Sequence, residues 1–519
     1  MKPHQRGTSL ALETILTVIG QGAWNGGTLV DNSAFENKNM FFKGNIPVTN
    51  GTIQSRIGIR TRVAAPPHER IGVAALKNLL DTGVVDPKRI KILIGATNVG
   101  EDKFDRGPLI RYPYEIVKEA CPEALVFDLY AGCPGYNVAV ELAFMLSLSG
   151  VLAPGDVTVI VGAENIHRAQ AFRPDDTAHI IFGDDAMATA LETRGVPASE
   201  GRYATKTLPG FRVQKDPISE IAERLLPLIG SEPLDGLILD HHLGSIENRI
   251  PATAARIQHA LVAQKHPDAA QNGRFVRFKD ALDFYDHHAP FFAFDIMSLE
   301  AKPHLVESVA GAYVRSGKYR RVASVFLSRD LEARIALHEG TGYVFQAPEK
   351  GIIDTLTRTH GCFADYIHVS RDADGVFGKM DGKGVFLYAT RSAPGHLSRL
   401  LAPHGLTLAD VDLLIEHQAN FAIIPMTLEQ VFNGGPGDVK EVVADFLANN
   451  MATNIHIRGN CSVVCMQRLP YDLQRGALRP DTIQGFGINQ NLEKLRQAKT
   501  IVNDSVGAGM TRSAFLQRC

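Results

Sequence analysis

The chain has 519 residues, too many for one ordinary hydrophobic core, so we expect two or more units. Lys and Arg number 54 against 56 Asp and Glu, and this net charge of −2 gives no reason to expect nucleic acid or an anionic membrane as a partner. Six cysteines are too few for a disulfide framework, which favours a reducing cytoplasm. No apolar run reaches the roughly 20 residues that a membrane span needs. The early stretch "LALETILTVIG" also lacks the basic flank and cleavage site of a secretory signal.

Short apolar runs rich in β-branched residues alternate along the chain with longer stretches of helical periodicity. In chain order the predicted strands include "RIKILIGATN", "DVTVIVGAEN", "LDGLILDHH", "RRVASVFLS" and "VDLLIEHQAN". Such alternation predicts an α/β fold in which helices cover both faces of the sheets.

Two stretches of the chain resemble each other. "FDLYAGCPGYNVAVELAFMLSLSG" aligns with the region that begins "FDIMSLEAKPHLVESVAGAYVRSG", with Phe127-Asp128 on Phe294-Asp295. In this register Glu300 stands where Cys133 stands. The alternative is that any two strand–helix–strand units look alike. We predict an N-terminal unit over 1–200, a Cys-less copy of it over 205–350, and a third unit over 351–519.

Cys133 lies where a predicted strand ends and a long apolar helix begins. A helix N-terminus favours the thiolate, the form in which cysteine attacks, because unpaired backbone N–H groups and the helix dipole stabilise negative charge. The neighbouring glycines leave space for a substrate and permit a sharp turn. The alternative is a small residue buried in the core, which is common for a free cysteine.

Two further polar groups follow predicted elements. His417, in "LLIEHQANFAIIP", comes directly after a buried strand, where α/β folds collect active-site groups. Asn460, in "IHIRGNCSVVC", is predicted to lie between a short strand and a helix that begins near Cys461-Ser462. Alternatively the histidine is structural and the asparagine only caps the helix.

Cys133 in "DLYAGCPGY", His417 in "EHQAN" and Asn460 in "RGNCS" occur in the order of the Cys–His–Asn triad of β-ketoacyl synthase III-like enzymes of the thiolase superfamily, which the chain resembles. Further matches are "SRIGIRTR", "VGAEN", "FGDDAMATAL" and "SVGAGMTRSAFL". The resemblance implies a five-layer αβαβα fold of two similar halves, over 51–195 and 380–519. The middle segment is then an inserted, degenerate half-domain. The family usually pairs as a homodimer through the sheet edge of its cysteine-bearing half.

The resemblance also implies an acyltransferase activity, in fatty-acid, polyketide or related secondary metabolism. Cys133 would take an acyl group from acyl-CoA or an acyl carrier protein, with no tightly bound cofactor. A second thioester, typically malonyl, would then be decarboxylated and condensed with that acyl group. His417 and Asn460 would stabilise the enolate. The backbone N–H groups of Cys133 and of the turn containing Gly507 and Gly509 would form the oxyanion hole.

The sequence departs from the family at the expected CoA site. Thr52 replaces a tryptophan that stacks on adenine, Asp176 replaces an arginine, and only Arg56 fits a basic position. A carrier protein or an altered donor is therefore favoured over CoA bound in the usual manner. Asp105 lies where relatives that join two long acyl chains carry a glutamate base, or it is a solvated loop carboxylate.

Other features favour no separate chemistry. The doublets His241-His242 and His287-His288 lack the spaced partners of a metal site, and none is predicted. Cys461 and Cys465 are predicted to line the buried side of a helix. Two alternative functions stay open. One is transfer of the acyl group from Cys133 to an alcohol or amine, and the other is a non-catalytic partner subunit.

Overall fold

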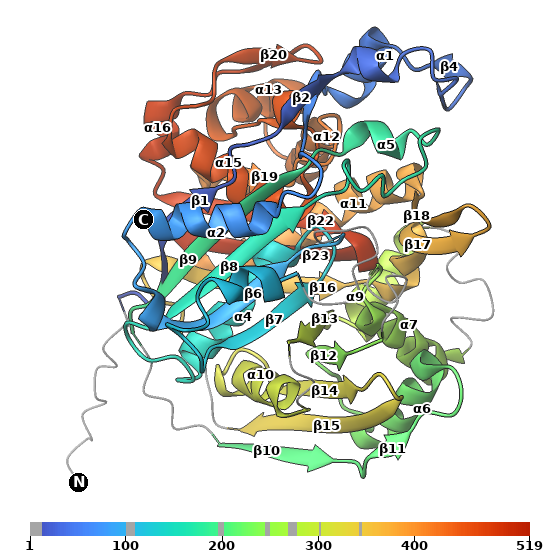
Figure 1. The fold of residues 1–519 in the computed structure, drawn as a ribbon, viewed down its shortest axis with the longest axis vertical. Helices are drawn as coiled ribbons and strands as arrows, with labels where there is room; N and C mark the ends of the chain where they lie inside the picture. The colour runs from blue at the N-terminus through green and yellow to red at the C-terminus, as the bar shows by residue number, and fades with distance from the viewer. Residues whose placement is uncertain are drawn as a thin grey trace.

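A computed structural model of the chain describes residues 13–99, 109–195, 202–243, 250–267, 278–299, 303–341 and 345–519. Its elements form one large and one small sheet with helices between and around them (Figure 1). The mixed α/β fold expected from the sequence is confirmed.

The large sheet has eleven strands. Its order is β1 (Leu16–Ala23), β9 (Asp185–Thr193), β8 (Val157–Glu164), β6 (Ile90–Ala96), β7 (Leu125–Tyr130), β13 (Phe292–Ser298), β12 (Gly236–His241), β14 (Arg321–Leu327), β15 (Glu332–Thr341) and β10 (Arg202–Thr207), with β11 (Phe211–Arg212) beside β15. Its first five strands come from the N-terminal region, and the other six come from residues 202–341, the inserted segment. Figure 1 shows the two parts one above the other, the inserted segment in green and yellow.

The small sheet comes from the C-terminal region. Its order is β16 (Gly351–Thr359), β23 (Thr511–Arg518), β22 (Thr500–Gly507) and β19 (Leu413–Glu416). Four two-stranded sheets complete the set: β2 (Thr28–Asp31) with β5 (Thr61–Ala64), β3 (Phe41–Phe42) with β4 (Ile46–Pro47), β17 (Ile367–Asp372) with β18 (Gly375–Met380), and β20 (Asp481–Ile483) with β21 (Phe486–Ile488).

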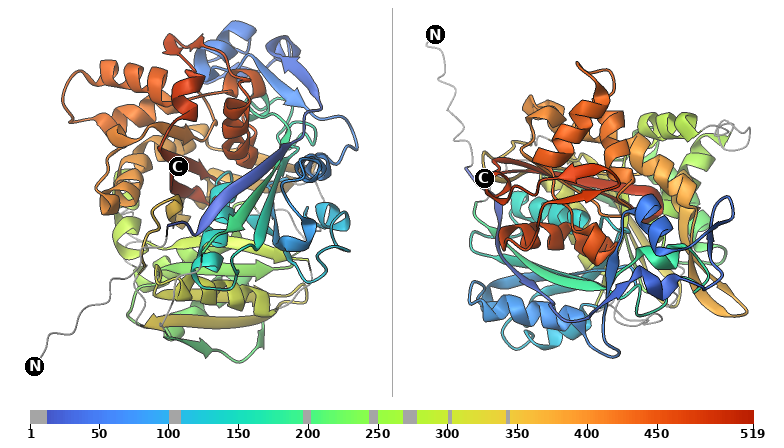
Figure 2. Two further views of the ribbon diagram at one scale, coloured as in Figure 1. Left: turned by 90° about the vertical axis from the view of Figure 1, so that its left-hand side faces the viewer. Right: turned by 90° about the horizontal axis from the view of Figure 1, so that it is seen from above.

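Helices separate and cover the sheets. Helix α2 (Ile71–Asp81) packs on the outer face of the large sheet, α4 (Gly135–Leu148) and α15 (Cys465–Gln474) lie between the sheets, and α11 (Gly382–Leu401) covers the small sheet (Figure 2). The other helices are α1 (Asn50–Ile57), α3 (Arg111–Glu115), α5 (Ala178–Ile181), α6 (Pro217–Ile229), α7 (Thr253–Lys265), α9 (Phe278–His288), α10 (Pro303–Arg315), α12 (Ile423–Phe432), α13 (Val439–Asn450), α14 (Ile455–Arg458) and α16 (Leu492–Arg496).

The composition of α4 explains its central position. All of its residues are buried, and it is apolar on nearly every side, which is typical of a helix enclosed by other elements. Strands β8 and β9 are likewise buried along their whole length, because helices cover both faces of their sheet. The helix that follows Cys133 is thus enclosed between the two sheets.

Two expectations from the sequence need correction. Residues 455–458 form the short helix α14 and not a strand; its Gly459 follows with φ of +70°, a left-handed conformation that ends the helix. The second concerns the edge of the cysteine-bearing sheet, which was expected to pair with another chain. Strand β13 of the same chain occupies that edge by pairing antiparallel with β7, so the edge is not available. Among the described residues, no helix is long and apolar enough to cross a membrane.

Candidate active site

Cys133 stands on the tight connection between β7, which ends at Tyr130, and α4, which begins at Gly135. Gly132 before it has φ of +69°, and a Cβ there would lie 2.5 Å from the backbone nitrogen of Ala508. Only glycine fits this turn, because both the conformation and the close approach exclude a side chain. The cysteine is partly exposed, as a nucleophile must be.

His417 and Asn460 approach Cys133 from the C-terminal region. His417 follows β19, and its backbone N–H donates to the Asp504 carbonyl of β22 at 2.9 Å. The oxygen Oδ1 of Asn460 accepts from the Ser462 N–H at 2.7 Å and lies 3.7 Å from the Cys465 Sγ. Because both contacts use the amide oxygen, the NH₂ group of Asn460 is oriented as a donor.

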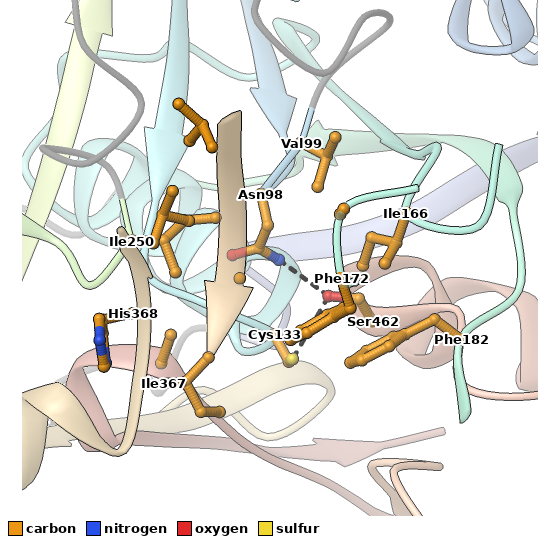
Figure 3. Close-up of a pocket in the computed structure, with 15 residues that line it drawn as sticks. Asn98, Val99, Cys133, Ile166, Phe172, Phe182, Ile250, Ile367, His368 and Ser462 are labelled. Atoms are coloured by element: carbon orange, nitrogen blue, oxygen red, sulfur yellow. Dashed lines mark hydrogen bonds between the residues drawn. The ribbon is translucent and has the colours of Figure 1, made fainter. Parts of the chain in front are cut away.

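Two cavities share Cys133. The first cavity, drawn in Figure 3, is almost entirely apolar; its lining includes Val99, Ile166, Phe172, Phe182, Ile250, Ile367, Val369 and Val376, with Asn98, Ser462 and Ala508 near the sulfur. The second cavity contains all three predicted catalytic residues, Cys133, His417 and Asn460, with Met380, Val385, Phe386, Ala389, Asn420 and Gly507 among its other walls. The sequence-predicted trio therefore meets in one cavity, and the sulfur lies where that cavity joins an apolar one.

The His417 ring lies between two thiols, those of Cys133 and Cys465. Burial lowers the pKa of His417, but interaction with Cys133 and Cys465 outweighs burial and raises the pKa to about 10. Burial raises the pKa of the Cys465 thiol, but hydrogen bonds from Cys461 and His417 bring that pKa down to about 6. Contact with the two sulfurs therefore favours a ring N–H that donates to negative charge beside Cys133.

A second hydrogen-bond chain reaches the sulfur of Cys133 (Figure 3). The Ser462 hydroxyl donates to the Cys133 Sγ at 3.3 Å, and Asn98 donates through Nδ2 to the Ser462 Oγ at 2.8 Å. The same Nδ2, and the Asn98 backbone N–H, donate to Glu164 Oε1 at 2.7 and 3.0 Å. Burial raises the pKa of Glu164 to about 7, although these hydrogen bonds oppose the shift.

Sequence reasoning missed four residues of the site, namely Asn98, Glu164, Ser462 and Cys465. Asn98 and Glu164 lie at the carboxyl ends of two neighbouring strands, β6 and β8, where α/β sheets gather functional groups, and this signal was present in "IGATN" and "VGAEN". Nothing in the sequence indicates that Ser462 reaches the sulfur, because that contact joins residues 329 positions apart. Cys465 was expected only to line the buried side of its helix.

The remaining expected residues lie as follows. Gly507 packs on Cys133, and a Cβ there would be 2.4 Å from the Cys133 nitrogen; Gly509 has φ of +87° in the turn that follows. Arg56 lies over the ring of Phe42 and lines neither cavity described above. Asp105 and Glu300 fall outside the described residues.

The histidine doublets have other contacts. His241 Nε2 lies 3.2 Å from Asp295, and His242 Nε2 lies 3.2 Å from Ser298 Oγ. His287 and His288 end helix α9, where His287 Nδ1 lies 2.6 Å from the carbonyl of Asp283. In the described ranges no group of three or more His, Cys, Asp or Glu is arranged to hold a metal ion.

Comparison with known proteins connects this geometry with one group of enzymes. No protein-family model matches the chain. The β-ketoacyl-[acyl-carrier-protein] synthase III of Laribacter hongkongensis is 29% identical over 226 residues, which cover 40% of this chain and 69% of the relative. The 3-oxoacyl-[acyl-carrier-protein] synthase III of Aquifex aeolicus superposes with a TM-score of 0.51 at 16% identity, over 97% of this chain and all of that one. The corresponding enzyme of Thermus thermophilus gives 0.52 at 16% identity, over 97% and 99%. The chain is therefore similar in sequence to β-ketoacyl-[acyl-carrier-protein] synthase III enzymes and shares their thiolase fold.

Proposed function

We propose that the chain is a condensing acyltransferase that forms an acyl-cysteine at Cys133 and joins the acyl group to a second thioester. The observation that carries this proposal is the meeting of Cys133, His417 and Asn460 in one cavity whose other walls are largely apolar. The adjoining first cavity, almost free of polar groups, supports an apolar acyl group as the one that the sulfur carries.

In the first half-reaction the Cys133 thiolate attacks the thioester carbonyl and expels the donor thiolate, which takes up a proton. The Ser462 hydroxyl supports the attacking charge, since it donates to the sulfur. The backbone N–H groups of Cys133 and of the turn after Gly507 are the proposed donors to the tetrahedral oxyanion, and the missing side chain at Gly507 permits their close approach. The product is a thioester on Cys133.

In the second half-reaction the acceptor thioester loses CO₂, and its enolate attacks the acyl carbonyl and releases the Cys133 thiolate. The enolate oxygen needs donors fixed before the charge develops. A ring N–H of His417 and the oriented NH₂ of Asn460 are proposed for this role, and such donors contribute about 3 kcal/mol each when the site excludes water.

The donor is proposed to be a phosphopantetheine-linked or CoA thioester, with no tightly bound cofactor. The structure gives CoA little specific support, because Arg56 is engaged with Phe42, and Asp176 Oδ1 accepts from the N–H of Ala178 at the start of α5. Thr52 belongs to the capping box of α1: its backbone N–H donates to the hydroxyl of the N-cap residue Thr49, and its own hydroxyl accepts from the Thr49 N–H. An acyl carrier protein is therefore the favoured donor.

Intact-protein mass spectrometry tests this proposal. After incubation with a panel of acyl-CoA and acyl-carrier-protein donors, we expect one acyl group on Cys133, none on Cys133→Ala, and normal acylation of the control Cys121→Ala, whose cysteine is buried away from both cavities. An adduct that survives Cys133→Ala, or no adduct with any donor, would contradict the assignment. Adding malonyl thioester to one portion and alcohols or amines to another then identifies the acceptor.

A further inference from the structure

We infer that the inserted segment, residues 202–341, is a built-in partner. In this inference it occupies the position beside β7 that a second chain would take, and it supplies Ile250 to the wall of the first cavity. The part that concerns Ile250 rests on the proposed acyl-cysteine function.

The two halves of the large sheet have the same topology when each is followed from its outer edge to the centre of the sheet. From one edge it is β1, β9, β8, β6, β7, and from the other it is β10, β15, β14, β12, β13. The directions agree as well: β6 is parallel to β7 and β8, as β12 is to β13 and β14, and β8–β9 and β14–β15 are both antiparallel. Two units of one topology therefore meet at the centre of the sheet.

The register at the centre is that of a two-fold axis. With Phe127-Asp128 placed on Phe294-Asp295, an offset of 167 residues, Leu129 corresponds to Ile296. In the sheet Leu129 pairs directly with Ile296, its own counterpart. Such self-pairing defines an isologous interface, the kind that normally joins two identical subunits.

The two units also share a detail that strand order does not require. Asp128 accepts hydrogen bonds from the backbone N–H groups of Leu109 and Ile110, at 2.6 and 3.0 Å, just before α3. Asp295, its counterpart, accepts from those of Thr253 and Ala254, at 2.6 and 2.8 Å, at the start of α7. A buried carboxylate with the same task at the same position favours duplication over chance likeness.

The contact between the two units is sealed by buried groups. Helices α4 and α10 pack together where the units meet. Glu141 of α4, fully buried, accepts a hydrogen bond from the Tyr319 hydroxyl of the inserted segment. The neighbouring Lys318 joins the inserted segment to the C-terminal region through an ion pair with Asp354 of β16. An exposed strand edge invites pairing with another chain, and here β13 removes that edge from β7.

Ile250 brings the inserted segment into the wall of the cavity that contains Cys133. Its side chain lines the same apolar cavity as Cys133, opposite residues of the N-terminal region such as Val99 and Ile166 (Figure 3). A cavity wall contributed by the partner unit would limit the size of the group that the sulfur can carry. The inserted segment would thus retain a role in specificity although it carries no cysteine in its described part.

Light scattering of the purified full chain tests the built-in partner. We expect the mass of one chain, 56.5 kDa, at every concentration of a wide dilution series. A stable species of two chains would overturn the inference. This measurement does not depend on activity, so it tests the built-in partner independently of the proposed function.

Alkyl methanethiosulfonates of increasing chain length test Ile250 without any acyl transfer. The Cys133 thiolate attacks the reagent sulfur, forming a mixed disulfide and releasing methanesulfinate, and peptide mapping locates the adduct. In Ile250→Ala the longest reagents should react several-fold faster relative to the shortest. The control is Ile229→Ala, since Ile229 belongs to the same segment and is 7% exposed, as is Ile250, but lines neither cavity. An unchanged length profile in folded Ile250→Ala would overturn the role of that residue.

Discussion

The cysteine-bearing half and the inserted segment differ most at the carboxyl ends of their strands. In the first, Asn98 and Glu164 are linked through Ser462 of the C-terminal region to the Cys133 sulfur. In the second, the polar groups bond to one another: the Ser298 hydroxyl donates to Asp240 at 2.8 Å and lies 3.2 Å from His242 Nε2.

The sheet registers show which residues correspond. Gly95 pairs with Asp128 as Leu239 pairs with Asp295, so His242 stands at the position of Asn98. Both positions carry a polar side chain, yet Asn98 contacts another region and His242 contacts its own strands. The same fold therefore supports a site only where a second half brings complementary groups, and the function resides in the contact between halves.

Removing the buried carboxylate that each copy carries, Asp128 or Asp295, should give the largest effect on stability. Asp128→Ala and Asp295→Ala each leave two backbone N–H groups unsatisfied in the interior, which should cost about 4 kcal/mol of unfolding free energy. Urea unfolding of the full chain measures this. Similar losses for the two variants would support equivalent positions, and a near-neutral Asp295→Ala would break the comparison.

Variants of a histidine in the C-terminal region and of one in the inserted segment should differ sharply in activity. His417→Ala or Asn460→Ala should leave Cys133 acylation largely intact but lower condensation ~100-fold or more, because the enolate loses a fixed donor. His242→Ala, in the inserted segment, should leave condensation unchanged, since His242 lines neither cavity. Single-turnover assays with pre-acylated protein isolate the second step. Equal condensation rates in all variants would remove His417 and Asn460 from the mechanism.

Glu164 should make stability depend on pH. Burial raises its pKa from 4.5 to about 7, so the folded protein holds this proton more tightly than the unfolded chain. The stabilisation is complete below pH 4.5 and is lost as the pH rises through about 7. Relative to Glu164→Gln, the wild type should lose about 2 kcal/mol between about pH 5.5 and 7.5, measured by urea unfolding.

Glu220 of the inserted segment should give the opposite dependence of stability on pH. Hydrogen bonds from the Gln214 backbone hold its pKa below the usual value, so its contribution is present at neutral pH and is lost on acidification. The difference between wild type and Glu220→Gln should therefore change only towards acid pH. If the difference in unfolding free energy between wild type and Glu164→Gln did not change with pH, the prediction that Glu164 is a buried carboxyl with a raised pKa would be wrong.

Much of the fold could be predicted from local pattern. The five quoted apolar runs correspond to β6, β8, β12, β14 and β19, and the apolar stretch after Cys133 forms α4. The short stretch at 455–458 was misread as a strand, because four residues carry too little periodicity to distinguish a strand from one helical turn. Pairing of β7 with β13 could not be predicted, since strand order depends on contacts between distant segments.

The site was predictable only in part. Cys133, His417 and Asn460 follow strands or turns with recognisable motifs, and the structure brings them into one cavity. Ser462 and Cys465 have no such signal, because their importance arises from where α15 and the preceding turn pack against β8, β9 and β19. Hydrogen bonds that join three regions of the chain are products of tertiary packing, and a local pattern does not contain them.

The smallest predicted effect is a difference in Cys133 reactivity between variants of Ser462 and Ser298. Ser462 donates to the Cys133 Sγ, whereas Ser298 donates to Asp240. Losing a hydrogen bond to a charged sulfur costs about 1.5 kcal/mol, so Ser462→Ala should slow alkylation of Cys133 by iodoacetamide ~10-fold at neutral pH. Ser298→Ala should leave that rate unchanged. Because alkylation needs no acyl donor, the pair of rates shows directly whether the C-terminal region activates the sulfur, and equal rates in both variants would mean that it does not.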